Sequence, residues 1–144
     1  REDMYGANVF KAKRDERVTA ASFYATGADS EYAVYVVKDF KDTSSFGNMD
    51  KVAEGVVDQA GYYTINFEKD VLVDKGEKFA VVLYIKTPGS SHPLAIEYDS
   101  GEDYLSTIDL KDGEGYVSYN GSKFINVKEK QECNLCIKAF TKNR

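Results

Sequence analysis

The alternation of apolar and polar side chains at every second residue is the feature that most constrains the fold of this chain. Residues 63–68 alternate strictly, which predicts a strand with one buried side and one solvent-facing side. Residues 79–85 are apolar throughout, which predicts a central strand that meets other protein on both faces. No stretch of about eleven or more residues keeps apolar side chains at the helical spacing, so we expect no long helix.

Further segments are rich in β-branched and aromatic residues, and Gly, Asp, Asn and Pro separate many of them. The predicted strands are 7–12, 17–25, 32–37, 94–98, 116–119, 124–127 and 135–141. Residues 38–50 are predicted to form the longest loop, with at most a short turn between Ser45 and Val52. About nine strands without intervening helices predict an all-β fold, a two-sheet antiparallel β-sandwich that is jelly-roll-like.

The size and charge of the chain limit its classes of partner. A length of 144 residues fits one core, so we expect a single domain over residues 1–144. The net charge of −5 argues against nucleic acid, whose binding normally needs a concentrated basic face. No apolar run approaches the roughly 20 residues of a membrane span. The chain opens at Arg1 without an initiator Met or a leader, which predicts a segment excised from a larger multidomain protein.

Cys133 and Cys136 form a Cys-x-x-Cys, the spacing of a redox pair or of half a zinc site. Zinc needs about four ligands, and His92 is the only histidine, so a complete site is not expected. Residues 135–141 are predicted as a strand, and two cysteines in one strand would stand about 10 Å apart, too far for a disulfide. A structural role as small hydrophobic residues is therefore favoured.

A thiol nucleophile could also pair Cys136 or Cys133 with His92 as its base. Two residues alone are weak evidence for such a pair. The sequence has no Gly-x-Ser-x-Gly nucleophile motif and no Gly-rich phosphate loop. We therefore predict a domain that is not an enzyme, with no catalytic residues.

Acidic side chains concentrate between Glu97 and Glu114. Calcium takes about six to eight oxygen ligands, so carboxylates that converge with loop carbonyls could bind it. The candidate ligands are Asp99, Asp103, Asp109 and Asp112. Their spacing is not that of the helix-loop-helix calcium motif, and a solvated acidic edge that discourages strand pairing is the favoured interpretation. Calcium is the one cofactor that stays open.

Tyrosines at strand ends or beside turns are candidates for sugar binding, because ring faces pack against the apolar faces of pyranose rings. They are Tyr62, Tyr98, Tyr104, Tyr116 and Tyr119, of which Tyr104 and Tyr119 are the leading ligand-binding candidates. Packing in the core or at a sheet edge is the favoured interpretation for each ring.

The segment Asn120-Gly121-Ser122 matches a glycosylation acceptor. However, Asn-Gly between two predicted strands is also the strongest short signal for a hairpin with a type I′ turn. The hairpin is the favoured interpretation.

Short matches in order along nearly the whole chain carry a resemblance to a known family. They are ANVF at 7–10, GYYTI at 61–65, KGEKFAVV at 75–82, PLAIE at 93–97, YNG at 119–121 and NLCIKAFT at 134–141. The chain resembles the lectin-like domain that follows the papain-type cysteine protease domain in bacterial cell-surface proteases. One departure is Phe124, since the resemblance leads us to expect Trp after the Asn-Gly turn.

The resemblance implies a jelly-roll-like sandwich at the cell surface or outside the cell. It also implies a non-catalytic accessory domain whose partner is a neighbouring protease domain or another surface protein. The family name refers to the fold and does not establish sugar binding. A carbohydrate-binding module for cell-wall or host glycans is the alternative function, and a hydrolase based on Cys136 and His92 is a third.

Overall fold

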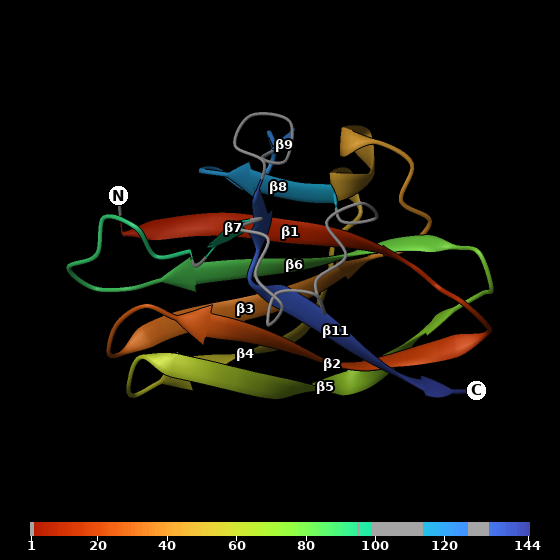
Figure 1. Cartoon of the computed structure of the whole chain (residues 1–144), viewed down its shortest axis with the longest axis horizontal. Coiled ribbons are helices and arrows are strands. Elements are labelled where there is room, and N and C mark those ends of the chain that lie inside the picture. The colour runs from red at the N-terminus through yellow and green to blue at the C-terminus, as the bar shows by residue number, and fades with distance from the viewer. Residues whose placement is uncertain (1, 95, 99–113, 127–132) are drawn as a thin grey trace.

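Strands dominate the computed structural model, which describes residues 2–94, 96–98, 114–126 and 133–144 (Figure 1). The strands are β1 (Asp3–Lys11), β2 (Glu16–Ala25), β3 (Ser30–Val37), β4 (Asp50–Val57), β5 (Gly61–Val73), β6 (Lys78–Lys86), β7 (Ile96–Tyr98), β8 (Glu114–Ser118), β9 (Ile125–Asn126), β10 (Cys133–Leu135) and β11 (Ile137–Asn143). A 3-10 helix, η1 (Thr43–Gly47), follows β3. No helix in this described part of the chain has the length and hydrophobicity that a membrane span requires.

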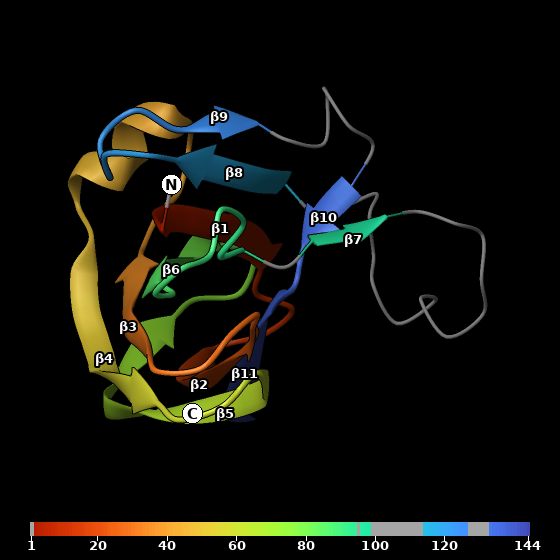
Figure 2. The same ribbon diagram turned by 90° about the vertical axis from the view of Figure 1, so that its left-hand side faces the viewer.

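Two antiparallel sheets form the layers of the sandwich. The larger sheet has the strand order β4-β3-β6-β1-β8-β9, and the smaller sheet has the order β11-β2-β5. Figure 2 shows the two layers end on, with β4 passing into β5 where the sheets meet and the β10-β7 pair beside them. The predicted two-sheet antiparallel β-sandwich is therefore confirmed.

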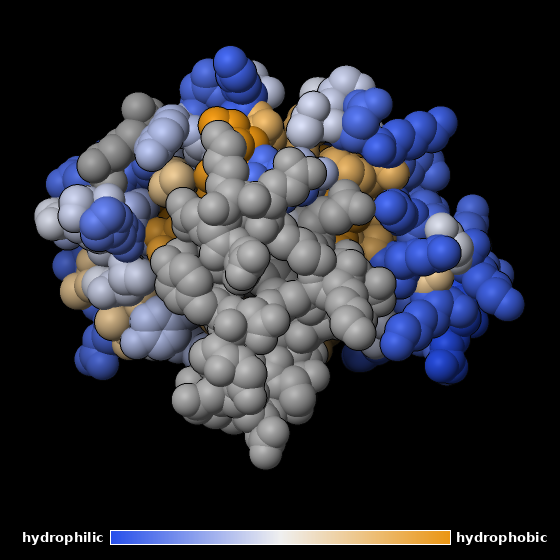
Figure 3. Space-filling view, turned by 45° about the horizontal axis from the view of Figure 1, so that its top comes forward, coloured by the Kyte–Doolittle hydropathy of each residue, from blue (hydrophilic) through white to orange (hydrophobic). Residues whose placement is uncertain are grey.

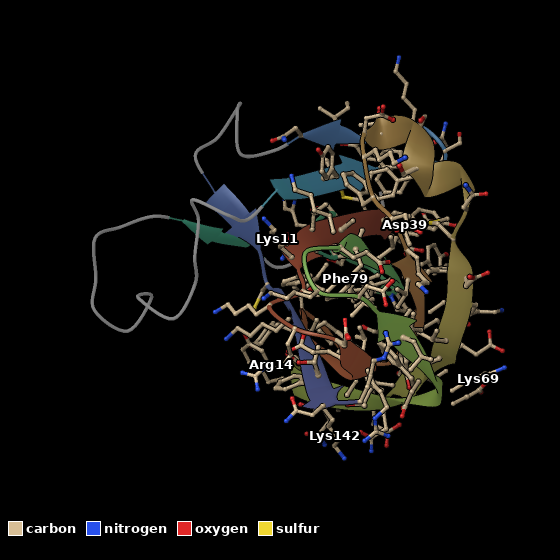
Figure 4. All side chains as sticks on the ribbon, turned by 90° about the vertical axis from the view of Figure 1, so that its right-hand side faces the viewer. Lys11, Arg14, Asp39, Lys69, Phe79 and Lys142 are labelled. Carbon is tan, nitrogen blue, oxygen red and sulfur yellow. The ribbon has the colours of Figure 1, made fainter. Side chains whose placement is uncertain are left out.

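The main core fills the space between the sheets. Phe79 stands there in Figure 4 and stacks on Phe10, with ring centroids 5.7 Å apart. The inward-facing side chains that surround this pair include Val18, Phe23, Val34, Val36, Val73, Val81, Leu83, Ile85 and Ile137. They come from alternate positions of β3 and β6, as the two-residue period predicts, and from β2, β5 and β11. In β2 the register shift between Val18 and Ala20 changes the phase, so Val18 and Phe23 both point inward.

A second hydrophobic cluster lies on the outer face of the larger sheet. It comprises Ala7, Val9, Val37, Phe40, Phe46, Ala80, Val82, Tyr116 and Phe124. Since Ala80 and Val82 of β6 belong to this cluster while Phe79 and Val81 belong to the main core, β6 is buried on both faces. The prediction of a central strand without alternation at 79–85 is confirmed.

The predicted loop at 38–50 supplies the cover for that outer face. Its 3-10 helix begins after Asp42, whose side chain accepts a hydrogen bond from the backbone N–H of Ser44 at 2.9 Å. The hydroxyl of Ser45 in turn faces the backbone N–H of Asp42, which completes a capping box. The cap fixes the position of Phe46, which is 3% exposed and fills the second cluster.

Strand β4 is absent from the sequence prediction. Its residues Val52 and Ala53 both pack into the main core, because the pairing of β3 with β4 shifts by one residue between Val34 and Tyr35. Two consecutive inward side chains destroy the alternation that would have predicted the strand.

The turn between β8 and β9 differs from its prediction. The two strands pair as expected, but a longer loop joins them, and of Asn120 and Gly121 only Gly121 has a positive φ, at 79°. A type I′ turn requires positive φ at both residues, so that assignment is wrong. The Asn120 Oδ1 atom instead accepts hydrogen bonds from the backbone N–H groups of Ser122 and Lys123, at 2.9 and 3.0 Å. The Asn120 side chain therefore organises the turn.

Candidate binding surface

Most of the predicted site residues fall outside the part of the chain that the structure describes. These are the calcium candidates Asp99, Asp103, Asp109 and Asp112 and the ring candidate Tyr104. The side chain of Tyr98 is also outside it. Within the described residues, no group of three or more His, Cys, Asp or Glu side chains is placed to hold a metal ion. The calcium site remains a prediction.

The remaining ring candidates differ in exposure. Tyr119 is 57% exposed in the turn after β8, and Tyr62 is 54% exposed on β5. Tyr116 is only 7% exposed and packs against Phe40 and Phe46, so the favoured interpretation of packing is confirmed for this ring. Tyr116 of β8 pairs with Ala7 of β1, and both side chains lie in the second cluster on the outer face of the larger sheet.

The cysteine chemistry that the sequence left open has little support. The predicted strand at 135–141 is interrupted at Cys136, which lies between β10 and β11. Its side chain is buried, and its Sγ atom lies 2.5 Å from the hydroxyl oxygen of Tyr62. His92 is exposed in the loop after β6, where its carbonyl accepts from the Thr26 hydroxyl. A buried thiol against a phenol is poorly placed to attack a substrate, since reactive thiols need solvent access.

The outer face of the smaller sheet brings together exposed rings from three strands. Phe23, Ile65 and Ile137 point into the core, so their neighbours along each strand point outward. We define the three-stranded face as these outward residues: Arg17, Ala20, Ser22 and Tyr24 of β2, Tyr62, Thr64, Asn66 and Leu72 of β5, and Lys138, Phe140 and Lys142 of β11.

The strand register places the rings of this face in two groups. Tyr24 pairs with Tyr62, and their rings meet edge to face with centroids 5.6 Å apart. Phe140 pairs with Ala20, four residues further along β2, which corresponds to roughly 13 Å at the usual strand rise. The row between them holds Ser22, which pairs with Thr64 on one side and Lys138 on the other.

Exposure sets this face apart. Tyr24, Tyr62 and Phe140 are 38%, 54% and 44% exposed, whereas Ala20 and Ser22 of the central strand are each 4% exposed. By contrast, the described surface in Figure 3 is mostly hydrophilic, with small hydrophobic areas. Several exposed rings on one sheet face indicate an interaction surface more strongly than rings scattered singly.

The face also carries positive charge. The ammonium of Lys138 lies 5.9 Å from the ring centroid of Tyr62, within the range of a cation–π interaction. Figure 4 shows Lys142 pointing away from the sandwich at the end of the same sheet. Arg17 lies in the row of Lys142, and its guanidinium contacts Asp70 at 3.0 Å.

Tyr24 and Phe140 were not among the predicted site residues. Both lie inside predicted strands, and the search for ligand-binding rings was restricted to strand ends and turns. A ring at the solvent-facing phase of an alternating strand is the signal that would have identified them.

Comparison with known proteins identifies the domain. The family model described as "Lectin like domain" matches residues 1–141. The chain belongs to the lectin-like domain family. This confirms the resemblance seen in the sequence.

Two solved structures of a clostridial cysteine protease are similar to this lectin-like domain. One contains the cysteine protease and lectin-like domains of Cwp84, a surface-layer-associated protein of Clostridium difficile, with 28% identity over 99% of this chain and 33% of that chain and a TM-score of 0.75. The other is clostridial Cwp84 after propeptide cleavage, with 28% identity over 100% of this chain and 37% of that chain and a TM-score of 0.77. No curated protein matches significantly. This lectin-like domain therefore spans about a third of the Cwp84 chains and matches their lectin-like part.

Proposed function

We propose that this lectin-like domain is a non-catalytic accessory domain of a bacterial cell-surface cysteine protease, which it positions or stabilises. The observation that carries the proposal is the extent of the match. Residues 1–141 fit the lectin-like family, while the chain covers only 33% of a Cwp84 chain that also contains a cysteine protease domain. Cwp84 is associated with the surface layer, which supports a location at the cell surface.

A deletion in the parent protein tests this function. The full-length protein and a version without residues 1–144 would be compared for the melting temperature of the remaining protein, its peptidase activity and its retention in the cell-wall fraction. We expect the deletion to lower the melting temperature or to release the protein from the wall. Unchanged stability, activity and retention would contradict the proposal.

A second candidate function is carbohydrate binding, and the exposure of Tyr24, Tyr62 and Phe140 on one face favours it. Sheet-borne rings are rigid, so little conformational entropy is lost when a flat ligand packs on them. A glycan array tests this candidate, with Tyr62→Ala and the earlier candidates Tyr104→Ala and Tyr119→Ala as variants. A blank array for the wild-type domain would remove it.

Calcium binding by Asp99, Asp103, Asp109 and Asp112 is also a proposal. A ligand that binds only the folded state raises the melting temperature by linkage. Calcium should therefore raise the melting temperature of the wild-type domain and have a smaller effect after Asp103→Asn and Asp109→Asn. No change with calcium would dismiss the site.

A further inference from the structure

We infer that the three-stranded face binds an acidic polysaccharide, with its rings against the sugar faces and its lysines against the acidic groups. This inference rests on the carbohydrate-binding candidate above and names the class of glycan. It starts from the basic side chains that stand beside the exposed rings of this face.

The three-stranded face carries basic side chains although the whole chain has a net charge of −5. Among the residues that define the face, Arg17, Lys138 and Lys142 are basic. Glu68 and Asp70 of β5 are also exposed, and Asp70 forms an ion pair with Arg17 at 3.0 Å, at one end. The two lysines are placed on β11 on either side of Phe140. Lysines beside exposed rings favour acidic ligands, because they attract the acidic groups of a ligand that packs on the rings.

The outer face of the larger sheet carries charges of both signs. Asp3 and Glu31 each pair with Lys86, and Glu54 forms an ion pair with Lys51 at 2.9 Å. Its aromatic rings Phe46, Tyr116 and Phe124 are buried in the second cluster. The three-stranded face differs from it because its lysines stand beside exposed rings.

The arrangement of rings and polar groups favours a sugar chain over a protein partner. The centre of a protein–protein interface is usually apolar, with polar groups at its rim. Here the polar row of Ser22, Thr64 and Lys138 lies between the rings of Tyr62 and Phe140. Hydroxyls and an ammonium at the centre fit the hydroxyl and acidic groups of a polysaccharide, and the rings fit its apolar faces.

The separation of the two ring groups also suits a polymer. Phe140 and the Tyr24–Tyr62 pair are about four residues apart along the strands, which is roughly 13 Å. A ligand that contacts both groups must extend over several sugar units. A single monosaccharide would contact one group only, so we expect affinity to rise with chain length.

The test is isothermal titration of the full 144-residue chain with three polymers. Polygalacturonate carries carboxylates on sugar rings, a wall teichoic acid carries phosphates, and dextran is neutral. We expect at least one acidic polymer to bind about tenfold more tightly than dextran, with an affinity that falls as salt is added. The two acidic polymers distinguish carboxylate from phosphate as the preferred group.

Substitutions separate the contributions of rings and charges. Tyr62→Ala and Phe140→Ala should each weaken binding of the preferred polymer about tenfold. The double variant Lys138→Gln with Lys142→Gln should abolish the preference over dextran and reduce the salt dependence. Ile125→Ala is the control, since it removes an exposed hydrophobic side chain, 39% exposed, from β9 of the larger sheet, outside this face. Circular dichroism and melting temperature establish that each variant is folded.

Each other result overturns the inference in a distinguishable way. Equal affinity for dextran and the acidic polymers, still sensitive to Tyr62→Ala, would retain carbohydrate binding and reject acidic selectivity. Loss of binding in the lysine variant but not in the ring variants would mean a charged surface without sugar recognition. No binding of any polymer would reject both. If Tyr62→Ala instead lowered the stability of the linked protease domain in the parent protein, the face would be an interdomain contact.

Discussion

The two outer faces of the sandwich differ in whether other segments of the chain cover them. On the larger sheet, η1 and the β8–β9 turn cover the strands and bury Phe46, Tyr116 and Phe124. On the smaller sheet, Tyr62 and Phe140 stay exposed. Aromatic side chains therefore stabilise the fold on one face and are available for a ligand on the other. The difference shows that the position of a ring in a strand does not decide its role, because segments distant in the sequence decide whether it is covered.

Removing one ring from each face should separate these roles most clearly. Phe46 stacks on Phe124 with ring centroids 4.0 Å apart and is 3% exposed. Phe46→Ala should reduce the free energy of unfolding by about 3–5 kcal/mol, measured by urea denaturation. Phe140→Ala is the same chemical change at a residue that is 44% exposed, and it should cost less than about 1 kcal/mol. Equal losses in the two variants would refute the distinction between the faces.

The turn that covers the larger sheet should tolerate little change at Gly121. Its φ is +79°, and a Cβ atom there would lie 2.8 Å from the Tyr5 ring. Gly76 has a similar φ of +83° with nothing within 4 Å of its Cβ position, so it is the matched control. Gly76→Ala should cost about 1–2 kcal/mol of stability through its backbone conformation. Gly121→Ala should cost about 1 kcal/mol more, because the ring must also move. Equal melting temperatures would show that Tyr5 moves freely.

The contrast between β6 and β4 explains which parts of the fold were predictable. The apolar run at 79–85 identified β6 as buried on both faces, because side chains of both phases of the strand pack in hydrophobic clusters. It did not identify β4, where the register shift beside Val34 and Tyr35 turns Val52 and Ala53 to the same side. A bulge depends on pairing with another strand, and the local sequence does not determine that pairing.

The candidate site was less predictable than the fold. Tyr62 was identified because it lies at the start of a strand, whereas Tyr24 and Phe140 were missed within strands. Spacing alone could not separate Tyr116 from the exposed rings, because its cover comes from Phe40 and Phe46, which are distant in the sequence. Burial of a ring depends on such tertiary contacts, which propensity and spacing do not contain.

The capping box of η1, which covers the outer face of the larger sheet, should give a smaller, pH-dependent effect on stability. Hydrogen bonds from the hydroxyl and backbone N–H of Ser44 lower the pKa of Asp42 below the ordinary value of 3.8. A carboxyl whose folded pKa is depressed contributes stability above its unfolded pKa and loses that contribution as pH falls through the folded pKa.

Asp42→Asn keeps the capping oxygen and removes the charge, so it isolates this contribution. We expect the melting temperature of the variant to lie slightly below that of the wild type at neutral pH. The difference should shrink as pH falls below about 4. A difference that stays constant down to acidic pH would mean that the charge of Asp42 contributes nothing to the cap.

The smallest effect on stability is expected at the acidic end of the larger sheet's outer face. Burial, together with the nearby carboxylate of Asp3, raises the pKa of Tyr84 to about 12. The Tyr84 hydroxyl also donates a hydrogen bond to Asp3 Oδ2 at 3.2 Å. Because the folded pKa lies above the ordinary value of 10.0, this contribution to stability is complete below pH 10 and is lost as pH rises toward 12.

Phenolate absorbance during an alkaline titration measures this pKa directly. Tyr84→Phe should remove a component that titrates near 12, and Asp3→Asn should move that component to lower pH, because the variant removes both the negative charge and the charged acceptor. The two variants should have nearly the wild-type melting temperature at neutral pH, where the phenol is protonated in both the folded and the unfolded chain. An unchanged titration in Asp3→Asn would mean that burial and the neighbouring Tyr5 and Glu31 raise the pKa of Tyr84 without a contribution from Asp3.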